Sequence, residues 1–182
     1  MEETNYKNIE DSQITMSQLM LPSYTNFNGK IHGGFILSLL DQIAFACASK
    51  HSGEYCVTAS VDTVDFLAPI EIGELVTMKA SINYVGTSSM VVGIRVEAQN
   101  IRTGKVKHCN SSYFTLVAQN SNGKTIKIPG LILKNDDDIR RFVKSFKRFE
   151  NKKMRQEEFD DIDFFSEKYL HLLEGYRVKL ER

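Results

Sequence analysis

One long apolar stretch, GFILSLLDQIAFACASK at residues 34–50, constrains the fold more than any other part of the sequence. It lacks the alternation of a strand, is longer than most strands, and is rich in the helix formers Leu, Ala and Gln. Its apolar residues cover nearly every direction around a helix, and a helix that is apolar all round is buried all round. The stretch therefore predicts one central helix that the rest of the domain encloses.

Four alternating segments follow this helix, joined by short links that carry Gly, Pro or Asn. The order predicts an α+β domain in which a curved antiparallel sheet wraps around the helix, because a doubly wound parallel sheet would need a helix after each strand. The expected strands lie at 56–66, 75–85, 90–98 and 105–118, after a first strand within 12–22. The residues expected to share one face are Val57, Ala59 and Val61; Val76, Met78, Ala80, Ile82 and Tyr84; and Met90, Val92, Ile94, Val96 and Ala98.

Length and composition fit one well-buried core with a small appendage in 182 residues. The 23 basic residues balance the 23 acidic ones, so no global charge indicates a nucleic-acid partner. The sequence MEETNYKNIEDSQ lacks the features of a signal peptide, and the longest apolar stretch falls short of a membrane span, so a cytoplasmic protein without a membrane partner is expected. The three cysteines, Cys47, Cys56 and Cys109, form no CxxC pair; this favours buried free thiols over disulfides or a zinc site.

The composition changes near residue 120, which divides the chain into a domain at 12–118, a linker at 119–130 and a charged extension at 131–182. In the extension, apolar residues recur at helical spacing, at 139–149 and again at 159–176. Two amphipathic helices that pack on the domain or on a neighbouring subunit are expected. A lid over the substrate site and a partner-binding element remain alternatives.

The unusual residue of the central helix is Asp41, since an ionised carboxylate removed from water costs several kcal/mol unless it is compensated. Asp41 lies about two turns after Gly34 and therefore on the same face of the helix. Exposed amides at a helix start, near Gly33 and Gly34, can polarise a carbonyl oxygen. Asp41 can then act as a general base or as a nucleophile, although a pairing role in a subunit interface is equally compatible with the pattern.

The segments LPSYTNFNGKIHGGFILSLLDQIAFACASKHSG and VTASVDTVDFLAPIEIGELVTMKASINYVGTSSMVVGIRVEAQNIRTGKVKHCNSSYFTLVA resemble the hotdog-fold acyl-CoA thioesterases of the cytosolic or brain acyl-CoA hydrolase type. The resemblance covers residues 14–118 and is carried by N-x-x-G-x-x-H-G-G followed by the helix aspartate. It implies a hotdog fold with the sheet around one central helix, to which the C-terminal helical extension, outside the resemblance, is added. It also implies hydrolysis of fatty acyl-CoA at a dimer interface, with acyl-CoA as substrate and no separate cofactor or metal.

The resemblance also implies roles for individual residues. Asp41 is the expected catalytic carboxylate, and Asn26 is expected to reach the site from the partner subunit. The amides near His32, Gly33 and Gly34 are the expected carbonyl-binding group, while the His32 side chain is either a base or a structural residue at the helix start. Coenzyme A is expected to contact a strand end and turn, for which an ordinary hairpin is the alternative: Asn83, Tyr84, Val85, Gly86, Thr87, Ser88 and Ser89.

A homodimer is the expected minimal active unit, and three dimers are expected to form a hexamer. Two other functions remain open at this point. One is a hotdog enoyl-thioester hydratase, which usually needs a histidine paired with an acid. The other is a non-catalytic acyl-CoA sensor or scaffold that retains the same site. The acyl chain length and any regulation by nucleotides cannot be read from the sequence.

Overall fold

The computed structural model describes residues 5–160, 162–179 and 181. The chain divides into two compact units, one that ends at Ser145 and one that begins at Phe146. The first unit contains the central helix, the sheet and the start of a long helix, α3 (Asp136–Asp160). It holds every residue that the sequence singles out for function.

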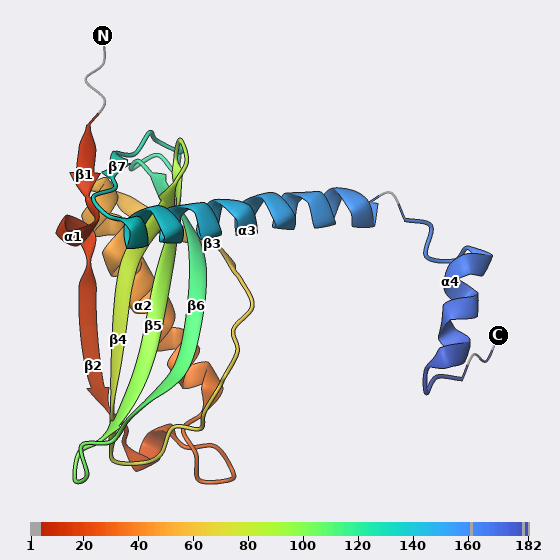
Figure 1. Ribbon diagram of the computed structural model, residues 1–182, viewed down its shortest axis with the longest axis horizontal. Coiled ribbons are helices and arrows are strands. Elements are labelled where there is room, and N and C mark those ends of the chain that lie inside the picture. Colours follow the sequence, from red (N-terminus) through yellow and green to blue (C-terminus); the bar gives the residue numbers. More distant parts are fainter. Residues whose placement is uncertain (1–4, 161, 180, 182) are drawn as a thin grey trace. The chain divides into compact units, whose positions relative to one another are not determined.

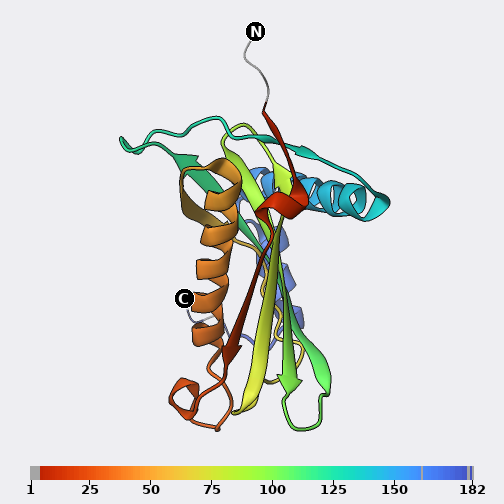
Figure 2. The same ribbon diagram turned by 90° about the vertical axis from the view of Figure 1, so that its left-hand side faces the viewer.

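The first unit is built on a five-stranded antiparallel sheet with the order β2-β4-β5-β6-β3 (Figure 1). Helix α2 (Gly33–Ser52) lies along one face of this sheet, and Figures 1 and 2 show the first turns of α3 on the opposite face. This is the hotdog fold, so the predicted fold class is confirmed. The strands are β2 (Ile14–Leu19), β3 (Tyr55–Val61), β4 (Glu74–Val85), β5 (Ser89–Asn100) and β6 (Val106–Gln119).

The core lies between α2 and the inner face of the sheet. From α2, Ile36, Leu40 and Ile43 are almost completely buried and pack among the inward side chains of the central strands. The inner faces predicted for β4 and β5 are confirmed from Val76 to Ile82 and from Met90 to Ala98. Because side chains alternate between the two faces of a sheet, the residues between them face outward, toward the side of α3.

Tyr84 departs from the predicted face. The pairing of β4 with β5 shifts between Ile82 and Tyr84, and such an irregularity interrupts the strict alternation of faces. Val85 packs against the core, whereas the Tyr84 ring lies 5.2 Å from that of Phe142 on α3. The irregular step therefore turns Tyr84 away from the core.

Two further predictions about faces are wrong. In β3, Val57 and Val61 do not share a face: they pair with Val117 and Phe114, which lie on opposite faces of β6, because the pairing shifts between Thr58 and Ser60. Helix α2 is not buried all round. It exposes one stripe that runs along its length and combines apolar and polar side chains: Leu37, Ser38, Asp41, Gln42 and Phe45.

Several short elements carry too few residues for a periodic pattern and were not predicted. A parallel pair is formed by β1 (Tyr6–Asn8) and β7 (Gly130–Ile132), and α1 (Ile9–Ser12) follows β1. A 3-10 turn, η1 (Pro22–Tyr24), leads toward α2. The segment between β6 and β7 is held by a bridge from Gln119 to Thr125 and by the buried side chain of Ile128.

In the second unit, α3 continues to Asp160 and is followed by α4 (Glu167–Leu172) and the 3-10 turn η2 (Leu173–Gly175). The rings of Phe159, Phe164 and Tyr169 lie next to one another, with centroids 6.3 and 6.1 Å apart. Both predicted helical segments thus contain helix, although the second is shorter than expected. Among the described helices, none combines the length and apolar character needed to cross a membrane.

All three cysteines are buried free thiols, as predicted. Burial raises the pKa of Cys47 to about 12, and its Sγ donates to the carbonyl of Ser12 at 3.2 Å. Burial also raises the pKa of Cys109. We therefore expect an aromatic disulfide reagent at pH 8 to label no thiol of the native protein within minutes and all three in denaturant, because the thiolate is the reacting form. Rapid labelling of any native thiol would contradict this.

Candidate active site

Helix α2 begins at Gly33 because His32 caps it. The His32 backbone is extended, and its Nδ1 accepts a hydrogen bond from the Gly34 amide at 3.0 Å. This satisfies one of the N–H groups that the first turn of a helix leaves without an intrahelical partner. This contact is the one that the structural interpretation of His32 predicts, and the role of His32 in the reaction stays a prediction. A Cβ at Gly34 would lie 2.7 Å from the His32 ring, so any larger residue here would displace the capping ring.

Of the three amides expected to bind the substrate carbonyl, those of His32, Gly33 and Gly34, two already have acceptors within the chain. The Gly34 amide is engaged by His32, and the His32 amide donates to the carbonyl of Tyr24 at 2.8 Å. In the part of the chain that the structure describes, the Gly33 N–H finds no acceptor. It lies at the positive end of the α2 dipole, where a developing oxyanion is stabilised. The Phe66 ring covers Gly33, with Cζ 3.3 Å from where a Cβ would be.

Asn26 shapes the loop that precedes the helix. Its Oδ1 accepts hydrogen bonds from the amides of Asn28 at 2.9 Å and Lys30 at 3.1 Å, and Gly29 takes a positive φ of 72° within the same turn. An asparagine that bonds the backbone two residues ahead stabilises such a turn. The Asn26 carbonyl group thus holds its own loop, which leaves the Nδ2 donors of the side chain for a ligand.

A cavity of about 410 Å³ brings Asn26 and Gly33 together. The volume is in the range of sites that bind small molecules. Its wall is largely apolar and comes from the loop before α2, the start of α2 and the segment before β4, with Lys30 as the charged residue. The lining residues are Asn26, Lys30, Ile31, Gly33, Ile36, Phe66, Leu67, Ala68, Pro69 and Ile70.

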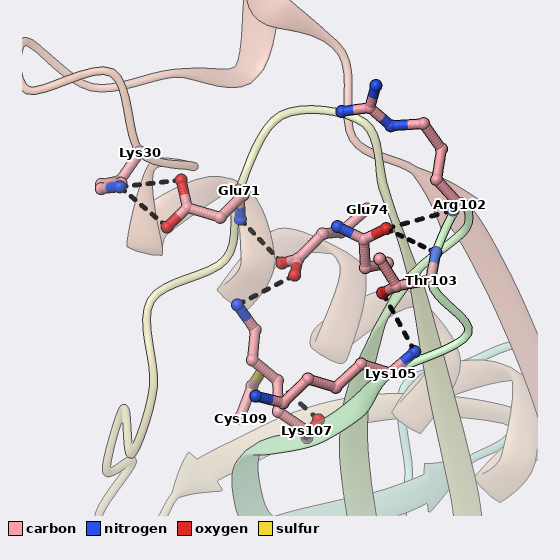
Figure 3. A network of polar contacts seen from close by, with 9 residues as sticks. Lys30, Glu71, Glu74, Arg102, Thr103, Lys105, Lys107 and Cys109 are labelled. Atoms are coloured by element: carbon pink, nitrogen blue, oxygen red, sulfur yellow. Dashed lines mark hydrogen bonds and ion pairs between the residues drawn. The ribbon is translucent and has the colours of Figure 1, made fainter.

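Polar contacts hold this wall of the cavity in place (Figure 3). Lys30 pairs with Glu71 at 2.7 Å, and the Glu71 amide donates to the carboxylate of Glu74 at 2.9 Å. Glu74 is almost fully buried and also pairs with Lys107 on β6 at 3.0 Å. The network ties the loop of Asn26 to the sheet, because Lys30 belongs to the same turn. A buried carboxylate needs such partners.

Asp41 lies farther along α2, about 12 Å from the helix start at 1.5 Å per residue. Its side chain is on the exposed stripe, and its Oδ1 accepts a hydrogen bond from Thr58 Oγ1 at 2.7 Å. Thr58 lies at the irregular step of β3, which places its hydroxyl toward the helix. The structure therefore brings Asp41 to a helix–strand seam that is open in the single chain, and it does not place Asn26 or Gly33 in contact with it.

The residues expected to bind coenzyme A occupy different places. Asn83 is buried on the outer face of β4, where its Oδ1 accepts from Ser81 Oγ at 3.0 Å. The turn that follows is held by its own backbone, by β6 and by the segment after β6: the Ser88 carbonyl accepts from the amide of Ala118, and the Thr87 carbonyl from that of Ile128. The role of these residues in binding coenzyme A stays a prediction.

Thr58 and Phe66 are the two residues near the candidate site that sequence reasoning missed. In the sequence, Thr58 is one of the alternating polar residues of a strand, as Ser60 is. Nothing distinguishes Thr58 until the irregular pairing of β3 is known. Phe66 lies after the strand, in a segment without periodicity, and nothing in the sequence indicates that its ring covers Gly33.

Comparison with known proteins agrees with this geometry. The sequence model of the thioesterase superfamily matches residues 28–105. Protein VdlD of Helicobacter pylori is 44% identical over 139 residues, which cover 76% of this chain and 79% of the relative. A Bacillus subtilis protein described as an uncharacterized acyl-CoA thioester hydrolase, YkhA, is 31% identical over 86% of this chain and 91% of its own length.

Solved structures of high similarity include an apo-hexameric acyl-CoA thioesterase (TM-score 0.81, 32% identity, 84% of this chain and 97% of that one). An acyl-CoA hydrolase from Staphylococcus aureus, in complex with butyryl coenzyme A, coenzyme A and coenzyme A disulfide, has a TM-score of 0.78 at 32% identity, over 85% and 94% of the chains. Single alanine mutants of that hydrolase replace an asparagine, an aspartate and a threonine. Their spacing along the chain is that of Asn26, Asp41 and Thr58 here. The chain belongs to the hotdog-fold acyl-CoA thioesterases of the thioesterase superfamily.

Proposed function

We propose that this protein hydrolyses fatty acyl-CoA to a free fatty acid and coenzyme A. The hydrogen bond from Thr58 on β3 to Asp41, which lies on the exposed and partly apolar stripe of α2, is the observation that carries the proposal. The mutants of the Staphylococcus aureus hydrolase support it, since they replace residues at the same spacing. The complex of that hydrolase with butyryl coenzyme A supports the substrate class.

In the proposed reaction, Asp41 removes a proton from water as the water oxygen attacks the thioester carbonyl carbon. The carbon–sulfur bond then breaks, the acyl group leaves as a carboxylic acid, and coenzyme A leaves as a thiol after it takes up a proton. Direct attack by Asp41 is the alternative, in which water hydrolyses the resulting anhydride. Because Gly33 and Asp41 lie about 12 Å apart on one helix, the Gly33 amide and α2 dipole that stabilise the negative charge on the carbonyl oxygen come from a second copy of the chain.

The proposed site is completed by a second copy of the chain. Leu37 and Phe45 are more than a third exposed on both sides of Asp41, and the neighbouring strand β3 has an unpaired edge. A partner on this face would cover the apolar side chains and pair the edge, both of which are unfavourable to leave in water. It would also carry its Asn26 loop, which this chain cannot bring to Asp41 by itself. The hexameric neighbour supports a trimer of such dimers.

The cavity beside Asn26 and Gly33 would then hold part of the substrate at the seam. We also propose a cytoplasmic location; a rat relative named cytosolic acyl coenzyme A thioester hydrolase is 29% identical over 80% of this chain and 39% of its own length. No cofactor is required, because the thioester is activated by hydrogen bonds and attacked by water. A separate metal ion is not part of the proposal.

The test is the release of free thiol from a panel of acyl-CoAs from acetyl to stearoyl, with the oligomeric state measured by light scattering. We expect turnover, a preference for some chain lengths, and a mass of at least a dimer. Coenzyme A binding without turnover of any acyl-CoA would overturn hydrolysis and favour a sensor. Hydration of an enoyl-CoA with its thioester intact would favour the hydratase instead.

A further inference from the structure

The segment between β3 and β4 forms one wall of the cavity beside Gly33. This strap (residues 62–70) contributes every residue from Phe66 to Ile70 to the lining. Phe66 is 50% exposed and Leu67 is 61% exposed, so both large apolar side chains remain partly in water beside the cavity. Apolar surface exposed in this way indicates contact with a ligand or a partner.

Backbone hydrogen bonds fix the strap on two sides. On the side of the sheet, the Leu67 amide donates to the carbonyl of Cys109 on β6 at 2.9 Å. On the side of the helix, the Ile31 amide donates to the Ile70 carbonyl at 3.0 Å. The strap therefore joins β6 to the loop that precedes α2, and its residues have defined positions relative to the helix start.

A buried side chain makes a further contact with the strap. Asn110 on β6 is only 1% exposed, and its Nδ2 donates to the Asp65 carbonyl at 2.9 Å. Its Oδ1 is buried and has no hydrogen-bond partner in the described part of the chain. Burial of an amide with an unpaired oxygen is unfavourable, so the structure retains Asn110 at a cost in stability. What this side chain supplies is the hydrogen bond to the strap.

An extra residue in β6 brings Asn110 and its neighbour to the strap. Val96 on β5 pairs with Asn110, and Glu97 pairs with His108, so Cys109 is the extra residue of a bulge. Bulges redirect groups of the strand in which they occur and are frequent beside active sites. Here the bulge provides both contacts of β6 with this part of the strap, the Cys109 carbonyl and the Asn110 amide group.

Phe66 lies between the two strap residues that β6 holds. Because Asp65 and Leu67 are both hydrogen-bonded to β6, the backbone is fixed on each side of Phe66. The Phe66 ring lies over Gly33, with Cζ at 3.3 Å and Cε2 at 3.5 Å from where a Cβ would be. The ring thus covers one side of the helix start and also lines the cavity.

We propose that Phe66 contacts the acyl group of the substrate beside the thioester, and that Asn110 is the positioning residue for its ring. The inference rests on the proposed hydrolysis. A hydrogen bond to a developing oxyanion is worth most where water is excluded, and the Phe66 ring excludes water from one side of the Gly33 amide. Asn110 is not among the residues that line the cavity, so it acts through the strap.

The first test is thiol release from acetyl-, butyryl- and octanoyl-CoA by Phe66→Ala and Phe66→Leu. Phe66→Ala should lower kcat about tenfold, because water then competes for the Gly33 amide. It should lower kcat/KM more for the two longer acyl groups, which lose an apolar contact. Phe66→Leu keeps an apolar cover and should restore most of both losses. Phe165→Ala removes the same ring from an exposed position between α3 and α4 and should keep full activity.

The second test is a double-mutant cycle between Phe66 and Asn110. Asn110→Leu keeps the size of the side chain and removes the donor to Asp65, and we expect kcat to fall about fivefold. The double variant Phe66→Ala/Asn110→Leu should be no slower than Phe66→Ala, because Asn110 acts through the ring. Losses that multiply would overturn the role of Asn110. Asn110→Ala replaces Asn110→Leu in the cycle if the leucine variant does not fold.

Unchanged kcat and unchanged acyl preference in Phe66→Ala would overturn the contact with the acyl group, as would an equal loss in Phe165→Ala. If the wild type hydrolyses none of these acyl-CoAs, the proposed function fails, and the contact is measured by calorimetric binding of octanoyl-CoA and coenzyme A. Phe66→Ala should then weaken octanoyl-CoA at least about fivefold more than coenzyme A. Equal weakening of the two would overturn the contact.

Discussion

Asp41→Asn is expected to reduce kcat/KM for acyl-CoA hydrolysis by about 10²- to 10⁴-fold, the range for loss of a general base. The substitution keeps the size of the side chain and an oxygen that can accept the hydrogen bond from Thr58, so the helix–strand contact can persist. It removes only the ability to take a proton from water or to attack the thioester. Thiol release from the preferred acyl-CoA measures the effect.

Thr58→Val tests how the carboxylate is oriented. Valine has nearly the shape of threonine and lacks the hydroxyl that donates to Asp41 at 2.7 Å. We expect a smaller loss than for Asp41→Asn, about tenfold and mainly in kcat, because the base is still present but less well held. Asp136→Asn, at the exposed start of α3, makes the same chemical change as Asp41→Asn and is the matched control for that variant. It should keep full activity.

Light scattering on each variant separates chemistry from assembly. If Asp41→Asn retained more than about a tenth of the activity with the oligomer intact, Asp41 could not be the base or nucleophile. If the variant instead dissociated, the interface interpretation of Asp41 would account for the loss. An intact oligomer without activity is the outcome that the proposed mechanism requires.

The fold was predictable because its signals are long and periodic. The α2 segment is long enough to define a helix, and strands β4 and β5 have enough alternating residues to define both the strand and its buried face. The exceptions arise where pairing is irregular. At Tyr84 and in β3, a shift of register moves side chains to the other face, and no local sequence pattern marks such a shift.

The candidate site was less predictable, because its parts depend on contacts between distant segments. The helix start and Asp41 were found from spacing, but the capping of Gly34 by His32 requires a ring orientation that spacing does not define. The exposed side of α2 was missed for a different reason. An apolar helix looks the same in sequence whether its last face is covered by its own sheet or left for a second subunit.

His51 provides the largest expected effect on stability. It is fully buried near the end of α2, with Nδ1 2.9 Å from Ser12 Oγ and Nε2 3.0 Å from the carbonyl of Pro129. A carbonyl can only accept, so Nε2 carries the proton and Nδ1 accepts from the Ser12 hydroxyl. The ring thus joins α1, α2 and the segment before β7. His51→Leu leaves the buried Ser12 hydroxyl and the partly buried Pro129 carbonyl without this hydrogen bond and should cost about 3 kcal/mol at pH 8.

The same residue makes the stability of the native protein sensitive to acid. Burial lowers the pKa of His51 below its ordinary 6.5, with a smaller contribution from the charge of Lys7, against the hydrogen bond to Pro129. Below pH 6.5 the unfolded chain therefore binds a proton that the folded chain does not. The free energy of unfolding decreases as the pH is lowered below 6.5. The free energy of unfolding is measured with urea at pH 8, 6.5 and 5.5, and the difference between the wild type and His51→Leu should become smaller at the lower pH values. The control His171→Leu, at an exposed position of α4, should show the same pH dependence as the wild type. A difference that is the same at all three pH values would mean that His51 acts through packing and hydrogen bonds, and that other groups cause the acid sensitivity.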